Sequence, residues 1–167
     1  MTDGRQMPQK PVLEVLCAIQ GALGEENQQI FSIAGVSLGR KWAKSIPRAA
    51  DVEDLLAKIA AYLRNGLQLA KTVEFERENQ DYVIRVRDCH LCHGHLVKER
   101  HGIVPACVIT MFPLGALIEN LGVRSARLKE VRKPGPPGDC DMVYSISVRQ
   151  SGSGASESKL RTEEVTG

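Results

Sequence analysis

The first third of the chain repeats its apolar residues with helical spacing. Over residues 11–23 the apolar positions recur every three or four residues and Gly24 follows them, which predicts an amphipathic helix that ends at a glycine. Residues 25–46 begin with two glutamates, carry lysines near their end and stop before Pro47. These features predict a second helix, because acidic residues suit the positive N-terminal end of a helix dipole and basic residues suit its other end.

A third helix is predicted over residues 52–65, where Asp51 can cap the first turn and Gly66 can end the last. The second predicted helix contains Gly35 and Gly39, and each glycine lowers helix stability by about 1 kcal/mol relative to alanine. Another group must therefore approach this face closely. We expect that group to be a neighbouring helix; a bound ligand is the alternative.

The pattern then changes to alternation, which is typical of strands. Residues 72–76 and 82–87 predict one β-hairpin, and residues 125–132 and 141–149 predict a second one after a proline-rich turn. Between the two hairpins we expect a loop rich in histidine, glycine and lysine, followed by a helix over residues 106–121.

These elements predict an α+β domain with an antiparallel sheet flanked by helices. The single domain is expected to span residues 11–149, with a flexible N-terminus over residues 1–10 and a disordered tail over residues 150–167, where the composition turns polar. Inside the domain, residues 90–105 form the predicted loop.

Composition narrows the functional classes. The chain has 167 residues, 43% of them apolar and 25% charged, which is typical of one globular domain. A net charge of +2 without a basic cluster argues against direct nucleic-acid binding. Neither a signal peptide nor a membrane-spanning segment is visible, so we expect a cytoplasmic protein whose thiols stay reduced.

Five cysteines in a reducing compartment favour metal binding over disulfides. Cys89 and Cys92 have two residues between them, a spacing that lets two thiolates point at one ion. Cys107 lies at the start of a predicted helix and Cys140 at the start of the last strand, so all four can converge at the ends of elements. They predict a closed structural zinc site, whereas Cys17 lies among apolar residues and is expected in the core.

Neighbouring histidines leave the ligand set open. His90, His93 or His95 is an alternative ligand in place of one thiolate, since imidazole also binds zinc. The histidines that do not bind metal are expected to be solvated loop residues, as is His101.

The segment 89–93 also fits the Cys-x-x-Cys-His pattern by which haem c is attached. That alternative requires export and a further iron ligand such as Met111 or Met142, and nothing in the sequence selects either. A thioredoxin-like redox site is disfavoured, because that motif opens a helix after a parallel strand rather than ending a hairpin.

Several motifs occur together in one order. A glycine-containing helix, Ile30–Ala43, precedes a helix, a hairpin and the Cys-His-Leu-Cys segment. A cysteine that opens a helix follows, and then a Gly138-Asp139-Cys140 turn into the last strand. Over roughly residues 12–149 the chain therefore resembles the four-vinyl-reductase domain family.

The resemblance implies a small-molecule binding domain of the TRAPP and NO-signalling type of fold, often dimeric. Relatives in this family include sensor domains of activators that respond to aromatic compounds, an accessory protein of bacteriochlorophyll biosynthesis, TRAPP subunits that hold an acyl chain, and stand-alone hydrocarbon-binding domains. Several members bind a structural zinc ion through cysteines near the pocket.

Carried over by position, Cys107 and Cys140 match the family's cysteines at the helix start and the last strand, and Cys89 and Cys92 match a Cys-x-x-Cys segment found in some members. Sensor-type members have a further cysteine where this chain has Lys133 and Pro134, so here the upstream pair would complete the site.

Function is therefore expected to be that of a zinc-stabilised binding or sensor domain for a hydrophobic molecule, acting through a homodimer or a partner protein. The alternative is an enzyme or accessory protein of the reductase or tetrapyrrole type that uses the metal. Four candidate thiolates favour a closed site over a catalytic one, which keeps one position open. The predicted pocket between helices and sheet is lined by Phe31, Gly35, Leu38, Gly39, Trp42, Tyr62, Phe112 and Leu117.

Overall fold

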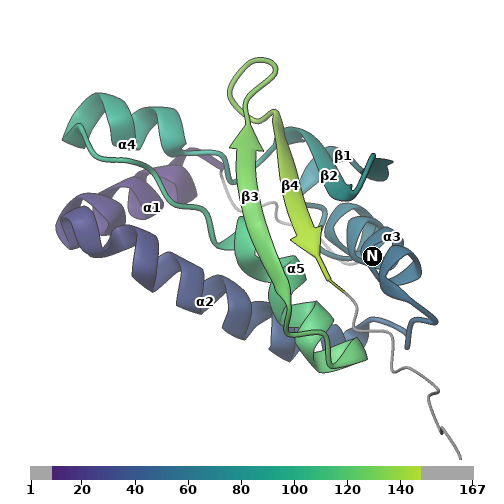
Figure 1. Cartoon of the computed structure of the whole chain (residues 1–167). Coiled ribbons are helices and arrows are strands. Elements are labelled where there is room, and N and C mark those ends of the chain that lie inside the picture. Colours follow the sequence, from purple (N-terminus) through teal and green to yellow (C-terminus); the bar gives the residue numbers. More distant parts are fainter. Residues whose placement is uncertain (1–8, 148–167) are drawn as a thin grey trace, which may run out of the picture.

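A four-stranded antiparallel sheet with helices packed on one face forms the body of the protein (Figure 1). The structure is a computed structural model that describes residues 9–147. The strands lie in the order β1-β2-β4-β3, so the two predicted hairpins are joined through β2 and β4 in the centre of the sheet. The predicted α+β class is confirmed. The strands are β1 (Ala70–Glu78), β2 (Asp81–Cys89), β3 (Ala126–Arg132) and β4 (Cys140–Ile146).

The predicted helices are present, and their boundary signals act as expected. The Asp51 side chain accepts the N–H of Asp54 at 2.9 Å, and Gly24 and Gly122 take positive φ angles of 58° and 68° beside helix ends. The described helices are α1 (Gln9–Leu23), α2 (Asn27–Trp42), α3 (Val52–Ala61), α4 (Gly94–His101) and α5 (Val108–Leu121). Short 3-10 turns, Gly24–Glu26 and Ala43–Ser45, flank α2, and a π-helical turn, Tyr62–Gly66, extends α3.

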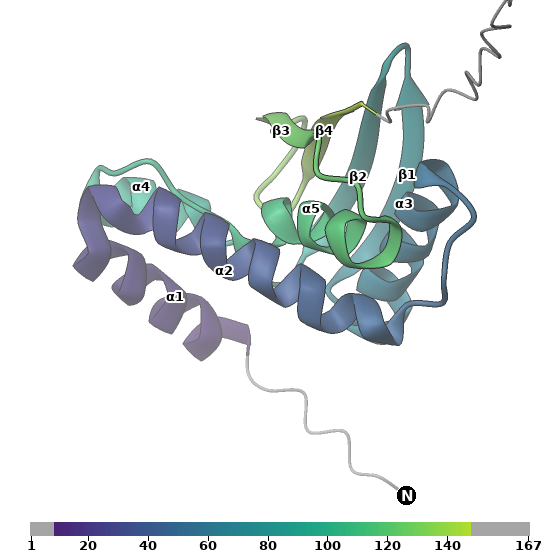
Figure 2. The same ribbon diagram turned by 60° about the horizontal axis from the view of Figure 1, so that its bottom comes forward.

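Helices α3 and α5 cover the apolar face of the sheet, and the C-terminal half of α2 packs against α5 (Figure 2). Successive strand residues point to opposite sides, so the opposite face carries charged side chains as well as the buried Val83 and Val143. On that face Arg85 forms ion pairs with Glu76 and Glu78, each at 2.7 Å. The core residues between sheet and helices include Leu55, Leu56, Ile59, Ile84, Phe112, Leu117, Met142 and Tyr144.

Residues 9–34, which we call the helical arm, project from this body (Figures 1 and 2). The arm consists of α1 and the first half of α2, and α4 packs against α1. Cys17 lies on α1 and is 1% exposed, which confirms the prediction that it is buried.

The structure differs from the prediction over residues 90–105, where α4 replaces part of the expected loop. This helix shows almost no apolar periodicity, since Val97 is its one buried residue. Gly102, in the left-handed region at φ 65°, ends it directly after basic residues. His101 is exposed as expected, but it lies at the end of α4 and its ring packs over Gly21 of α1.

Helices α2 and α5 approach until their backbones touch. A Cβ atom on Gly39 would lie 2.1 Å from the carbonyl oxygen of Phe112, and one on Gly115 would lie 2.1 Å from that of Val36. Gly35 also faces α5, and a Cβ atom on it would lie 2.3 Å from the carbonyl oxygen of Val108. The expectation that a neighbouring helix occupies the glycine face of α2 is confirmed.

Of the flexible N-terminus predicted over residues 1–10, residues 1–8 lie outside the described residues, as does the predicted tail over residues 150–167, whereas residues 9 and 10 belong to α1. The last predicted strand is shorter than expected, because β4 ends at Ile146. Within residues 9–147 no helix combines the length and apolar character that a membrane span requires.

Replacing Gly39 with alanine should destabilise the protein by at least about 2 kcal/mol, as overpacking does in a tight core. Alanine's better helix propensity, about 1 kcal/mol, cannot offset a Cβ 2.1 Å from a backbone oxygen. Urea unfolding followed by circular dichroism would measure the difference. Gln29→Ala, on the exposed side of α2, is the matched control and should change stability by less than about 0.5 kcal/mol. Equal effects of both variants would contradict close helix packing.

Candidate metal centre

The sheet brings Cys89 and Cys140 to neighbouring strand ends. Asp88 takes a left-handed conformation with φ 56°, and its N–H donates to the Oδ1 atom of Asp139 at 3.0 Å. The next N–H, that of Cys89, donates to the carbonyl of Gly138 at 3.0 Å. These two bonds fasten the β3–β4 turn, which leads into Cys140, to the start of the Cys-x-x-Cys segment.

The Cys-x-x-Cys segment is a tight turn. The N–H of Cys92 donates to the carbonyl of Cys89 at 3.3 Å. The N–H of Leu91 interacts with the Cys89 sulfur and favours its thiolate form. A backbone N–H directed at sulfur is the environment that a thiolate ligand needs.

Cys107 is the N-cap residue of α5. The N–H groups of Ile109 and Thr110 interact with its sulfur and favour the thiolate. The Tyr144 hydroxyl of β4 donates to the carbonyl of Thr110 at 2.7 Å, which ties the first turn of α5 to the strand that begins at Cys140.

The four predicted ligands lie in one neighbourhood although they come from three separate segments. Cys92, Cys107 and Cys140 each raise the pKa of Cys89, and Cys92 and Cys107 raise that of Cys140, so the four lie near one another. The fold therefore brings together the cysteines that the sequence singled out, and it leaves Cys17 apart on α1.

Burial disfavours the thiolate form of three of these cysteines. It raises the pKa of Cys89 to about 12 and that of Cys140 to about 11, and it also raises the pKa of Cys107. The Lys133 ammonium acts in the opposite direction and lowers the pKa of Cys107 and Cys140. A metal ion bound here would have to displace thiol protons, as thiolate coordination requires.

The donors fit zinc by chemistry, while their present side-chain positions do not form a coordination sphere. Within residues 9–147 no three or more His, Cys, Asp or Glu side chains are placed as a group that could hold a metal ion. Changing χ1 between staggered positions moves a cysteine sulfur without moving the backbone. Binding one ion would therefore require some of these side chains to change rotamer.

Both ring nitrogens of His93 have hydrogen-bond partners. Gln20 fixes the arrangement, because its Oε1 accepts the N–H of Ala106 at 2.8 Å and its Nε2 donates to the carbonyl of Ala106 at 2.7 Å. The same Nε2 lies against His93 Nε2, which must accept. His93 Nδ1 therefore carries the proton and donates to the carbonyl of Leu91 at 2.7 Å. Neither nitrogen of His93 keeps a free lone pair for a metal ion.

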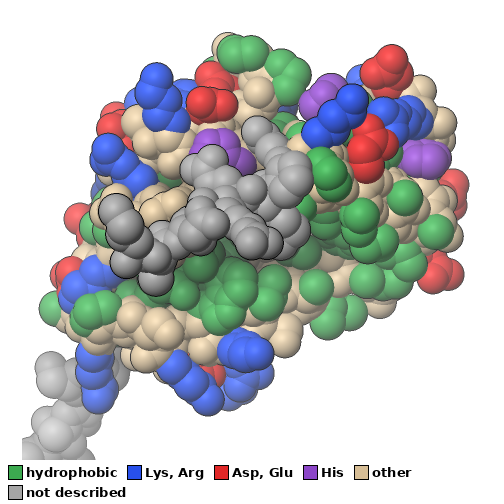
Figure 3. All heavy atoms as spheres, turned by 180° about the vertical axis from the view of Figure 1, so that it is seen from behind, with side chains coloured by type: hydrophobic (Ala, Val, Ile, Leu, Met, Phe, Trp, Pro, Cys, Tyr) green, Lys and Arg blue, Asp and Glu red, His purple; other side chains and the backbone are tan. Residues whose placement is uncertain are grey.

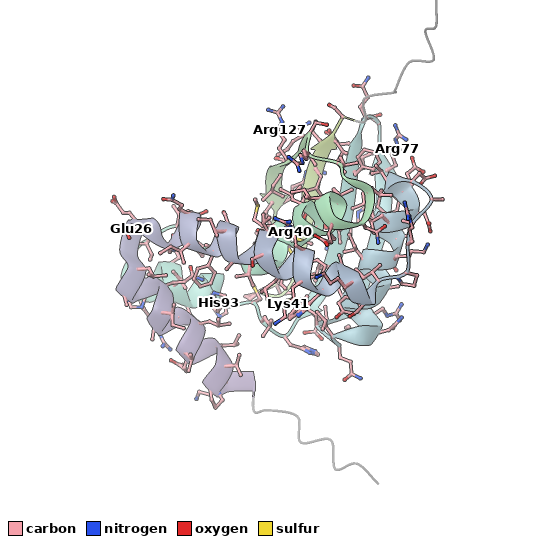
Figure 4. All side chains as sticks on the ribbon, turned by 90° about the horizontal axis from the view of Figure 1, so that it is seen from below. Glu26, Arg40, Lys41, Arg77, His93 and Arg127 are labelled. Carbon is pink, nitrogen blue, oxygen red and sulfur yellow. The ribbon has the colours of Figure 1, made fainter. Side chains whose placement is uncertain are left out.

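The side-chain amides of Gln20 and Asn27 hold the segment before Cys107 against the helical arm. Gln20 is 0% and Asn27 1% exposed. The Nδ2 of Asn27 donates to Gln20 Oε1 at 3.0 Å and to the carbonyl of Val104 at 2.9 Å. In Figure 4 His93 lies in the angle between α1 and α2, where these side chains meet. The network was not predicted; its signal in the sequence is a glutamine on the same face of α1 as Cys17.

The other two alternative ligands, His90 and His95, are exposed. His95 is in the first turn of α4, and the N–H of His90 donates to the carbonyl of Leu69 at 2.9 Å. Their part in a metal site stays a prediction.

Three of the predicted pocket residues form an aromatic cluster. The Phe112 ring lies 5.8 Å from Trp42 and 6.4 Å from Tyr62, measured between centroids. Phe112 and Leu117 are fully buried, whereas Leu38, Trp42 and Tyr62 are half-buried. Phe31 is 7% exposed, and Gly35 and Gly39 are covered by the α5 backbone.

Two open hollows in the described surface lie elsewhere. One, of about 490 Å³, lies between α1 and α4, and the other, of about 350 Å³, lies at the end of β3 and β4. Neither is lined by the residues predicted for the pocket, which stays a prediction. The lining residues are Lys10, Leu13, Glu14, Leu96 and Arg100 for the first, and Arg124, Ser125, Ala126, Arg127, Ser145 and Ser147 for the second.

No protein-family model, curated protein or solved structure matches the chain. The resemblance to the four-vinyl-reductase domain family therefore rests on the motifs of the sequence.

Gln20→Leu should destabilise the protein by about 3 kcal/mol, because it leaves the buried N–H and carbonyl of Ala106 without partners. Equilibrium unfolding in urea would measure this. Gln28→Ala is the matched control, since Gln28 also donates to the carbonyls of Val104 and Pro105 but is exposed. We expect the control to lose less than about 1 kcal/mol. A Gln20 variant no less stable than the control would refute the network's role.

Proposed function

We propose that Cys89, Cys92, Cys107 and Cys140 bind one structural zinc ion that joins the end of the sheet to α5. The observation that carries the proposal is the junction at which hydrogen bonds hold Cys89 beside Gly138, in the turn before Cys140, and tie the first turn of α5, which Cys107 caps, to β4. Backbone N–H groups directed at the sulfurs of Cys89 and Cys107 support it, since they favour thiolates. Lys133 adds positive charge beside a site that would carry four negative ligands.

The donor set suits a closed site. Four thiolates satisfy tetrahedral zinc completely and leave no position for water, so the ion would stabilise the fold rather than catalyse a reaction. It would cross-link three segments that are far apart in the sequence. His93 is the alternative that the hydrogen bonds argue against, because both of its nitrogens are already used.

We further propose that the domain binds a hydrophobic small molecule in the cytoplasm and acts through a second copy or a partner protein. The resemblance to the four-vinyl-reductase domain family supports this role. A second support is the contact of the two half-buried rings of Trp42 and Tyr62 with Phe112, which offers an apolar surface near solvent.

Purified protein should contain one zinc ion per chain, and Cys107→Ser should lose it. Elemental analysis would measure the metal content, and thermal unfolding with and without a chelator should show that zinc raises the melting temperature. Cys17→Ser is the matched control, because Cys17 is buried on α1 outside the cluster. Cys17→Ser and His93→Gln should both keep full zinc content.

Two results would count against this assignment. Zinc retained by Cys107→Ser would remove that residue from the ligand set. A Soret band in the visible spectrum would show a covalently attached haem, and the zinc assignment would then be wrong.

Ligand binding should change the fluorescence of Trp42, which is the one tryptophan in the chain. Titration with long-chain fatty acids and polycyclic aromatic hydrocarbons should give a saturable change for at least one class. Tyr62→Leu should weaken that binding about 10-fold, which corresponds to ~1.4 kcal/mol. Phe75→Leu changes an aromatic residue that is not among the predicted lining residues and should leave the affinity unchanged. No saturable signal from either class would refute the pocket.

A further inference from the structure

Helix α2 has a continuous exposed face opposite its glycines. Glu26, Ile30, Ile33, Ser37 and Lys41 follow one another at intervals of three or four residues, so they share one side of the helix, which we call the α2 stripe. All five are exposed, and Ile33 is 63% and Ile30 40% exposed. Two large apolar side chains in the middle of a polar surface helix mark a face that no element of residues 9–147 covers.

The α2 stripe has an acidic residue, Glu26, at one end and a basic residue, Lys41, at the other. Figure 4 shows Glu26 near one end of α2 and Lys41 toward the other. Within residues 9–147 neither of these side chains forms an ion pair. Their spacings about the centre differ by one residue, because Glu26 precedes Ile33 by seven residues and Lys41 follows it by eight. At 1.5 Å per residue the two charges lie about 22 Å apart along the axis.

We propose that a second copy of this chain packs its own α2 stripe against this one in antiparallel orientation. A two-fold axis beside Ile33 would place Glu26 next to the partner's Lys41, and Lys41 next to the partner's Glu26. Ile33 would meet the partner's Ile33 at the centre. Such an isologous contact requires a self-complementary surface. The α2 stripe has that property, because an acidic end and a basic end lie seven and eight residues from Ile33 in its apolar middle.

The apolar middle supplies the attraction and the charges set the register. Exposed ion pairs contribute little to affinity but disfavour wrong pairings. A parallel arrangement would place like charges beside each other. Hydrophobic side chains also gather on the side of the molecule that carries α1 and α2 when it is seen from behind (Figure 3). Val15 at 57% and Ile19 at 44% exposure belong to this arm.

Charge reversal tests the orientation as well as the contact. Analytical ultracentrifugation of the full chain should show a monomer–dimer equilibrium that weakens with added salt. Glu26→Lys and Lys41→Glu should each weaken dimerisation about 10-fold, since each creates two like-charge pairs. An equimolar mixture of the two variants should regain the wild-type affinity, because the mixed dimer has opposite charges at both positions.

Ile33→Glu should give a monomer, whereas Val104→Glu, at an apolar residue of 71% exposure outside the α2 stripe, should dimerise as the wild type does. A monomeric wild type, or a mixture that fails to regain affinity, would overturn the proposal. Although this contact gives the proposed second copy a surface, it does not rest on the zinc site or the pocket. Zinc content measured on the same samples keeps the two tests separate.

Discussion

The contact between α2 and α5 determines where most of the other parts lie. Gly35, Gly39 and Gly115 remove the side chains that would separate the two helices, so backbone meets backbone. Helix α5 then lies between α2 and the sheet, with Cys107 at its N-terminus and Phe112 in the core. The opposite face of α2 is left exposed with Ile33 at its centre. One close helix contact thus positions both the cysteine cluster and the α2 stripe.

The cysteine cluster lies at a junction that is already held by other bonds. Hydrogen bonds from Asp88 and Cys89 fasten the β3–β4 turn, and Tyr144 ties β4 to the start of α5. Gln20 holds Ala106, the residue before Cys107. These hydrogen bonds hold the backbone around the thiols, and a zinc ion would add a cross-link there.

Sequence patterns were sufficient for most elements and insufficient for contacts between them. Strong periodicity and end signals, such as Asp51 and Gly122, predicted the long helices and both hairpins. Helix α4 was missed because an exposed charged helix has no apolar repeat. The roles of Gln20 and His93 were missed because a polar side chain on an apolar helix face does not reveal its partner, which here is 73 residues away.

By itself, the sequence determined which residues are chemically able to bind a soft metal and which segments become helices or strands, since both depend on local residue type and spacing. Tertiary structure decided which of those donors meet. It brought four cysteines from three segments together, engaged both nitrogens of His93 with other partners, and covered Gly35 and Gly39 with a helix. The physical reason is that hydrogen bonding and close packing act between residues far apart in the chain, where spacing carries no information.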